Sequence, residues 1–341
     1  MSRFAPHSFA GGKIAQNRVV VPPMASETSD AAGSATAATI AHYAKLASSG
    51  AGIVFAEYAF VHPSGRGEEN QLGADSDERL PGLGKIAAAV KRTGALAGLQ
   101  LVHVGGKTTT AFAGGTPMSP SGVLVPVKGW EPDSSRAMEI SDVKLWVRWF
   151  TEAAVRAQRA GFDLVELHAA HGYGLNQWLS PLTNKRADEY GGGISGRGRL
   201  LFEIVDSIRA AAPGLLIAVR LPGQDHMEGG LTPAEMGGLV NRLERAGVDL
   251  IDVSSGIGGW RRPEGRSGEG YLVDDAAALK TFTTLPVIGV GGIETGGFID
   301  RILGEGRVDF AAVGRAVLKD PQAWGAAHLR AAGNRIEGGV I

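Results

Sequence analysis

Residues 163–190 read DLVELHAAHGYGLNQWLSPLTNKRADEY. The stretch begins with a short apolar run at residues 164–167, preceded by Gly161, and this pattern predicts a buried parallel strand. His168, His171 and Tyr173 follow where that strand is expected to end. Two imidazoles and a phenol in that place could bind and protonate a carbonyl compound. The alternative, a pair of core histidines with satisfied hydrogen bonds, stays open at this point.

The same pattern, a short apolar run followed by an amphipathic helix, recurs along the chain. Strands are expected at residues 18–21, 52–56, 97–102, 164–167, 215–221, 250–253, 287–290 and 310–313. Helices are expected at residues 39–48, 83–90, 143–160, 199–211 and 276–282, and another opens at the capping-box sequence of residues 232–235. Eight strand–helix units in series predict an α/β protein with a (β/α)8 TIM barrel. A doubly wound sheet is the alternative, but Pro-Pro-Met at residues 22–24 cannot form its Gly-rich dinucleotide turn.

A long segment at residues 104–139 interrupts this rhythm between the third strand and its helix. It is rich in Gly, Pro, Ser and Thr, and residues 118–127 are expected to form a small hairpin. A loop of this length on a compact barrel is more often functional than idle, so we expect it to cap part of the site. No linker or shift in composition divides the chain, and residues 1–341 are expected to form a single domain.

The composition excludes several classes of protein. The 341 residues are 44% hydrophobic, carry a formal net charge of -1 and include no cysteine. The balanced charge gives no electrostatic reason to expect nucleic acid or an anionic membrane as a partner. The lack of cysteine excludes disulfides, thiolate nucleophiles, Fe–S clusters and cysteine-based zinc sites. Neither a signal-peptide core nor an 18-residue apolar run occurs, so a cytoplasmic location is the simplest expectation.

Polar side chains gather at the carboxyl ends of the expected strands, where the active site of a TIM barrel lies. These ends carry Pro23, Met24 and Ala25, Glu57 and Tyr58, Gln100 and His103, and Arg220. Arg220 needs an acceptor, because burying an unpaired guanidinium is costly. Glu166 could supply that acceptor, or the pyrimidine edge of a reduced flavin could. Gln100 could serve the edge of a flat heterocycle, or could be a structural glutamine.

The last two strands end in glycines that predict a phosphate site. Gly291, Gly292 and Gly314 leave backbone N–H groups free to face an anion, and the following helices add their positive N-termini. Arg315 could add a charge-assisted contact. The alternative is that these glycines only shape turns.

The histidines of residues 168–171 do not predict a metal site. They follow a strand and do not share one face of a helix. No third histidine or aspartate lies at a recognisable ligand spacing, so no metal ligand is expected.

Longer motifs resemble a known family. The strongest is ELHAAHGYGLNQWLSPLTNKRADEYGG at residues 166–192. Others follow in order: NRVVVPPM at 17–24, EYAFVHPSGRG at 57–67, GLQLVHVGGK at 98–107, AVRLP at 218–222, EGGLTPAE at 228–235, GVGGI at 289–293 and VGRAVLKDP at 313–321. Over nearly its whole length the chain resembles the old yellow enzyme family of FMN-dependent ene-reductases, in a single-barrel form without an Fe–S cluster.

The resemblance implies a barrel that holds FMN non-covalently across its C-terminal mouth and uses NAD(P)H as reductant. The residues that would contact FMN by family pattern are Pro23, Met24, Ala25, Tyr58, Gln100 and Arg220 around the ring system, with Gly291, Gly292, Gly314 and Arg315 at the phosphate. His168 and His171 would hold the carbonyl oxygen of an α,β-unsaturated carbonyl substrate. Tyr173 would donate a proton to that substrate. This is oxyanion-hole stabilisation combined with general acid catalysis.

Four positions depart from the family pattern and bear on substrate range and redox potential. Ala25 stands where Cys or Thr usually contacts the flavin, and Glu27 stands where a close branch places a substrate-contacting tyrosine. Gly106 replaces a common arginine, although Lys107 remains, and Tyr58 is bulkier than usual. Two alternatives keep the cofactor: an enzyme for another substrate such as an N-methylated amine (a demethylase), which Glu27 would suit, and an FMN-binding protein without ene-reductase turnover.

The oligomeric state stays open, with a homo-oligomer as one alternative. Relatives can insert a C-terminal arginine into the site of a neighbouring subunit, and Arg330 and Arg335 lie in the tail of this chain. A solvated helix end is the favoured interpretation of both residues.

Overall fold

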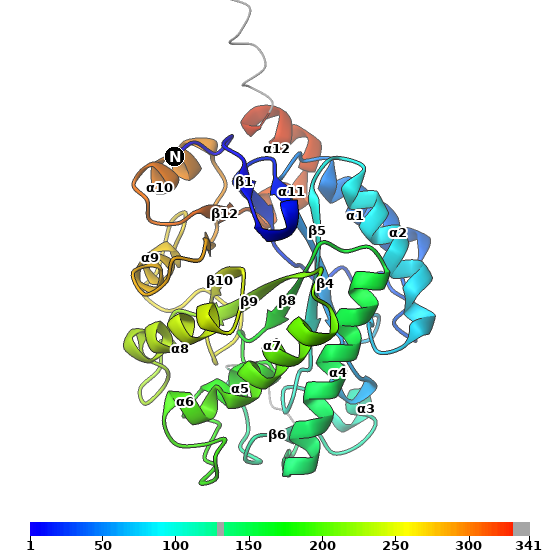
Figure 1. Ribbon diagram of the computed structural model, residues 1–341, viewed down its shortest axis with the longest axis vertical. Coiled ribbons are helices and arrows are strands. Elements are labelled where there is room, and N and C mark those ends of the chain that lie inside the picture. Colours follow the sequence, from blue (N-terminus) through cyan, green and yellow to red (C-terminus); the bar gives the residue numbers. More distant parts are fainter. Residues whose placement is uncertain (128–132, 330–341) are drawn as a thin grey trace, which may run out of the picture.

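Eight parallel strands form a closed barrel in the computed structural model, which describes residues 1–127 and 133–329 (Figure 1). In chain order the barrel strands are β3 (Val19–Val21), β4 (Ile53–Phe60), β5 (Leu96–Val102), β8 (Leu164–His168), β9 (Leu216–Pro222), β10 (Leu250–Ser254), β11 (Val287–Gly289) and β12 (Phe310–Ala312). Each strand pairs in parallel with the next, and β12 pairs with β3 to close the barrel. The predicted (β/α)8 TIM barrel is confirmed.

Helices connect the strands and cover the outside of the barrel (Figure 1). They are α1 (Ala37–Ala47), α2 (Leu80–Lys91), α4 (Ile140–Arg159), α7 (Arg199–Ala211), α8 (Pro233–Arg245), α9 (Val273–Lys280), α10 (Gly296–Gly304), α11 (Arg315–Lys319) and α12 (Pro321–His328). Three short helices, α3 (Thr110–Ala113), α5 (Gly174–Leu179) and α6 (Ile194–Arg197), lie in longer connections. The capping box expected at the start of α8 is present, because the side chains of Thr232 and Glu235 each accept the other's backbone N–H.

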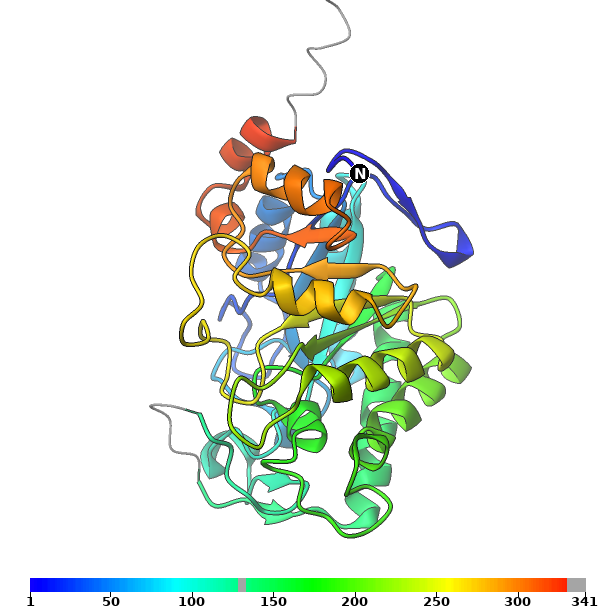
Figure 2. The ribbon, with the colours of Figure 1, turned by 90° about the vertical axis from the view of Figure 1, so that its left-hand side faces the viewer.

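An antiparallel hairpin of β1 (His7–Ser8) and β2 (Ile14–Ala15) precedes the first barrel strand. Phe9 at its turn stacks on Phe310 of β12, with ring centroids 6.0 Å apart, and both belong to the buried cluster inside the barrel. Figure 2 shows the hairpin (dark blue) on the right of the barrel and the connection from β10 to α9 (yellow) on the left. The amino-terminal end of the barrel is therefore filled by an apolar core, and the polar side chains of a functional site are expected at the opposite end.

The hairpin predicted at residues 118–127 is wrong. β6 (Met118–Ser119) pairs instead with β7 (Arg136–Ala137), and the two run parallel. Parallel strands cannot be joined by a tight turn, so the chain between them makes a longer excursion. Residues 128–132 of this excursion lie outside the described residues. The loop does contribute Lys107 and Val127 to the wall of a cavity, in agreement with the expected cap.

β4 extends four residues beyond its predicted end, through an irregularity that the sequence pattern does not show. Its register against β5 shifts between Ala56 and Ala59. A bulge of this kind bends the strand and changes the direction of its side chains. The Glu57 side chain is buried between the barrel and α1, where its carboxylate accepts a hydrogen bond from the Tyr43 hydroxyl at 3.0 Å. Tyr58 lines a cavity at the carboxyl ends of the strands.

Within the described ranges, no helix is long and apolar enough to cross a membrane.

Candidate active site

Three neighbouring cavities lie at the carboxyl ends of the barrel strands, with volumes of about 510, 290 and 250 Å³. The predicted site residues that line the largest are Pro23, Met24, Ala25, His171, Arg220, Gly291, Gly292, Gly314 and Arg315. The middle cavity shares the first five of these and adds Tyr58, Gln100, His168 and Tyr173. The structure therefore brings every predicted site residue to the wall of two adjoining cavities. Their size suits a cofactor or another small molecule.

The glycines after β11 form a tight backbone turn at the far end of the largest cavity. Gly291 and Gly292 have φ of 118° and 66°, which only glycine adopts without strain. A Cβ on Gly291 would lie 2.8 Å from the backbone nitrogen of Leu272, and one on Gly292 would lie 3.3 Å from Nη2 of Arg315. The turn thus places bare backbone next to a guanidinium, an arrangement suited to an anion.

His168, His171 and Tyr173 meet in the middle cavity, where His168 is the last residue of β8 and the other two follow it. The ring centroids of His168 lie 4.9 Å from those of both His171 and Tyr173. His171 adopts φ of 61°, a conformation that costs energy in a non-glycine residue. It is held there because its Nε2 pairs with the Ser254 hydroxyl at 2.7 Å and its carbonyl accepts from Lys107 Nζ at 2.7 Å.

The His168 ring contains a buried nitrogen without a hydrogen-bond partner in the described part of the chain. Among the described residues, Nδ1 of His168 is buried and makes no hydrogen bond. A core histidine would have both ring nitrogens satisfied. The core-histidine interpretation therefore does not describe His168, whose imidazole can still bind a ligand in the cavity.

The protonation states follow from burial. Burial lowers the pKa of His168 and His171 well below the ordinary value, and the charge of Arg220 lowers both further. Both imidazoles are therefore neutral near pH 7, each with one N–H to donate. Burial, together with the charge of Glu68, raises the pKa of the Tyr173 phenol, which keeps its proton.

A buried network of four polar side chains forms the floor beneath these groups. Gln100 and Glu166 are paired across β5 and β8, and the Gln100 amide donates to Glu166 Oε1 at 2.7 Å. Arg220 and Asp252 are paired across β9 and β10, with Nε and Oδ2 3.1 Å apart. The partner of Arg220 is thus Asp252, which the sequence interpretation did not name, and not Glu166.

The two carboxyl groups of this network differ in protonation. Burial raises the pKa of both, and for Glu166 the charge of Asp252 raises it further. The charge of Arg220 opposes the effect of burial at Asp252. Glu166 is consequently the member that holds a proton, and the charge of Asp252 faces Arg220.

Comparison with known proteins identifies this arrangement. Residues 3–328 match the family model described as the NADH:flavin oxidoreductase / NADH oxidase family. The chain belongs to this family. It is 37% identical over 309 residues to an NADPH dehydrogenase of Bacillus subtilis, covering 90% of this chain and 88% of that protein. It is 36% identical over 328 residues to an NADH oxidase of Thermoanaerobacter brockii, covering 93% of this chain but only 50% of that longer protein.

Solved structures agree with the family assignment. An old yellow enzyme homologue from Zymomonas mobilis superimposes with a TM-score of 0.83 at 26% identity, covering 95% of this chain and 91% of that one. A 2-naphthoyl-CoA reductase in complex with 2-naphthoyl-CoA gives a TM-score of 0.87 at 26% identity, covering 94% of this chain and 51% of that one. The resemblance to old yellow enzymes is confirmed, and the protein is an FMN-dependent NAD(P)H oxidoreductase.

The two larger cavities of this family member offer groups that fit FMN. The glycine turn and Arg315 could hold a phosphate at one end. At the other end, Gln100 and Arg220 offer an amide and a guanidinium to the edge of a flat heterocycle. The apolar surface of Met24 lies between the two ends and borders both cavities.

Two polar residues named from the sequence lie away from the site. His103 is fully buried, stacks on Trp146 with ring centroids 4.1 Å apart and lines none of the three cavities. Burial lowers its pKa to about 3, so it is a structural core histidine. Glu27 is exposed and also lines none of these cavities. Arg330 and Arg335 lie outside the described residues.

Sequence reasoning missed Asp252, which pairs with Arg220, and two side chains that line the cavities, Glu68 and Trp260. Asp252 interrupts an apolar strand, and that interruption was a usable signal. Glu68 and Trp260 lie in irregular loops, where no periodicity marks them. Trp260 is 66% exposed yet lines all three cavities, which suits a residue that covers a bound ligand.

Replacing Asp252 with Asn removes the charge that neutralises Arg220. Breaking a buried ion pair leaves an uncompensated charge, so we expect the free energy of unfolding to fall by about 3 kcal/mol. Chemical denaturation measures it. The control Glu152→Gln removes exposed pairs with Arg148 and Arg156 and should cost less than about 1 kcal/mol. An equal decrease in the free energy of unfolding in the two variants would show that the Arg220–Asp252 pair stabilises the fold no more than a surface pair does.

Proposed function

We propose that the protein is an ene-reductase, which reduces the carbon–carbon double bond of an α,β-unsaturated carbonyl compound at the expense of NAD(P)H. The observation that carries the proposal is the convergence of two neutral imidazoles and a protonated phenol in one cavity beside Arg220. FMN, when bound, supplies the hydride that NAD(P)H has donated. The protein supplies orientation, charge stabilisation and a proton.

His168 and His171 hold the carbonyl oxygen of the substrate in this proposal. Their neutral rings donate N–H groups to an oxygen that gains negative charge as the double bond is reduced. The Ser254 hydroxyl at 2.7 Å fixes the orientation of the His171 ring. Removing one such donor typically costs about 10²–10³ in rate.

Tyr173 is the proposed proton donor to the α-carbon. Its raised pKa keeps the proton on the phenol until charge develops on the substrate. Its ring lies 4.9 Å from His168, so the donor and the oxygen-binding groups face the same small volume. General acid catalysis of this kind contributes about 10²–10⁴ in rate.

The cofactor-binding roles are part of the same proposal. Pro23, Met24, Ala25, Tyr58, Gln100 and Arg220 would surround the ring system of FMN, and Gly291, Gly292, Gly314 and Arg315 would hold its phosphate. Their position around two continuous cavities supports this assignment. Residues 1–341 are proposed to act as one FMN-binding barrel domain, and the oligomeric state is left open.

The amine alternative loses the residue that motivated it. Glu27 was the acidic group expected to suit a cationic substrate, but its side chain lies outside the three cavities. Reduction of the flavin by an N-methylated amine without NAD(P)H would restore that alternative. Retention of FMN without any enone-dependent oxidation of NAD(P)H would favour a binding protein.

Replacing Tyr173 with Phe tests the proton donor. The purified protein should be yellow, and in anaerobic stopped-flow NADPH should bleach the flavin and 2-cyclohexenone should restore it. Tyr173→Phe should slow reoxidation by the enone by about 10²-fold or more, with little effect on reduction by NADPH. The control Tyr190→Phe removes a hydroxyl bonded to Glu203, away from the cavities, and should change neither step. Equal slowing of both steps by Tyr173→Phe would contradict its role as acid.

The pH dependence tests the neutral imidazoles. A histidine whose pKa is lowered stays neutral as the pH falls through the ordinary value near 6.5. The rate of reoxidation by the enone should therefore be flat between about pH 5.5 and 7.5, and titration of the two imidazoles should change it only at lower pH. A step centred near pH 6.5 in the stopped-flow rates would show that an imidazole titrates normally.

A further inference from the structure

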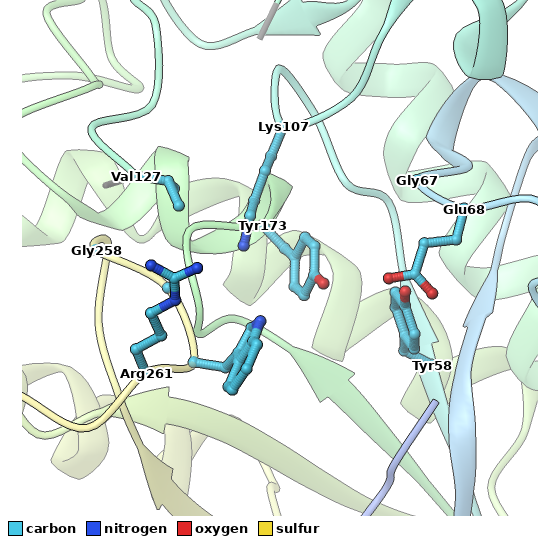
Figure 3. A pocket seen from close by; sticks show the side chains of 10 residues that line it. Tyr58, Gly67, Glu68, Lys107, Val127, Tyr173, Gly258 and Arg261 are labelled. Atoms are coloured by element: carbon cyan, nitrogen blue, oxygen red, sulfur yellow. The ribbon is translucent and has the colours of Figure 1, made fainter. Parts of the chain in front are cut away.

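The smallest cavity contains polar groups that the proposed reaction does not use. Tyr58, Glu68, Lys107 and Tyr173 line it, together with residues of two loops. Figure 3 shows the Tyr58 hydroxyl next to the Glu68 carboxylate, with the Tyr173 hydroxyl on the same side. Glu68 also lines the middle cavity, so it borders both the site and the space outside it.

Tyr58 lies beside both Tyr173 and Glu68. Its ring stacks on the ring of Tyr173, with centroids 5.5 Å apart and planes 27° apart. Its hydroxyl lies next to the Glu68 carboxylate, and the Tyr173 hydroxyl lies on the same side of the cavity (Figure 3). Tyr58 is 6% exposed, whereas Glu68 is only half-buried. The three side chains therefore bring three oxygens together where the smallest and the middle cavities adjoin, since all three line both.

Two features of the fold hold the Tyr58 and Glu68 side chains in place. The bulge in β4 lies at Tyr58 and turns its side chain into the site. The buried Gln71 then ties the loop of Glu68 to that strand. Its amide donates to the Tyr58 carbonyl at 3.0 Å, and its own carbonyl accepts from Gly67 N at 2.8 Å. The carboxylate and the phenol are thus fixed relative to each other by an independent contact.

The proposed reaction requires a source of protons for Tyr173, and its neighbouring polar groups can supply one. Tyr173 gives up its proton in every turnover and must recover it before the next one. Lys107 lies over the face of the Tyr173 ring, 4.3 Å from its centroid, and donates to the His171 carbonyl. It can stabilise a transient phenolate by its charge, but it does not sit at the hydroxyl. The phenol beside that of Tyr173 belongs to Tyr58, whose ring stacks on it.

We propose that Tyr58 and Glu68 form a proton relay that restores the Tyr173 proton after each turnover, an inference that rests on the proposed role of Tyr173 as acid. The Glu68 carboxylate takes a proton from water in the smallest cavity and passes it to the Tyr58 oxygen. The O–H bond of Tyr58 breaks as its own proton moves to the Tyr173 oxygen. One proton enters, one reaches Tyr173, and Tyr58 and Glu68 end as they began.

The test compares one turnover with many. Tyr58→Phe and Glu68→Gln keep the ring and the size of the side chain but interrupt the relay. With pre-reduced enzyme and one equivalent of 2-cyclohexenone, Glu68→Gln should react within about twofold of the wild type, because Tyr173 starts protonated. In steady state with NADPH, kcat should fall about tenfold or more and acquire a larger solvent deuterium isotope effect. Added imidazole buffer should restore kcat in the variants and leave the wild type unchanged.

Tyr190→Phe and Glu203→Gln are the matched controls, since Tyr190 and Glu203 form a tyrosine–glutamate pair at 3.0 Å outside the cavities. They should change neither measurement. If Tyr58→Phe loses FMN, Glu68→Gln in its half-buried loop carries the test. Unchanged kcat without buffer dependence, while Tyr173→Phe still slows the single turnover, would overturn the relay alone. An unaffected single turnover in Tyr173→Phe would overturn the proposed acid, and the relay with it.

Discussion

The ion pair between Arg220 and Asp252 is the constraint on which the site depends. A guanidinium inside a barrel cannot stay unpaired, and its partner must come from the adjacent strand in register. Once Asp252 is ionised to meet Arg220, Glu166 beside it takes up a proton and is hydrogen-bonded on one side by Gln100. The floor of the site is therefore polar and organised, with its charges balanced before any ligand binds.

The charge of Arg220 also acts on the groups above the floor. Together with burial, it holds both imidazoles neutral, which is the state that can donate an N–H without adding a positive charge. Burial acts in the opposite sense on the phenol of Tyr173 and keeps its proton in place. A single buried environment thus prepares two kinds of hydrogen donor, because desolvation always favours the neutral form. The apolar end of the barrel, closed by Phe9 and Phe310, leaves these effects concentrated at the other end.

The fold could be predicted because each strand is a short apolar run followed by a helical pattern. All eight strands lie within a few residues of their expected places, and all predicted site residues line the cavities, although their roles stay predictions. What could not be predicted depends on pairing across the chain. The bulge at Tyr58, the parallel pairing of β6 with β7 and the choice of Asp252 over Glu166 by Arg220 are set by register between distant segments. No local pattern carries that information.

The departures from family pattern separate into two groups once they are placed in space. Glu27 is exposed and lines none of the three cavities. Ala25 borders the two larger cavities and adds no polar atom to their wall. Tyr58 is different, because its ring stacks on that of Tyr173 and its hydroxyl is added to two cavities that Glu68 also lines. The wall opposite His168 and His171 is therefore where this chain adds groups of its own. In the proposed mechanism Tyr173 must regain its proton after each turnover, and Tyr58 and Glu68 on that wall are the groups proposed to return it.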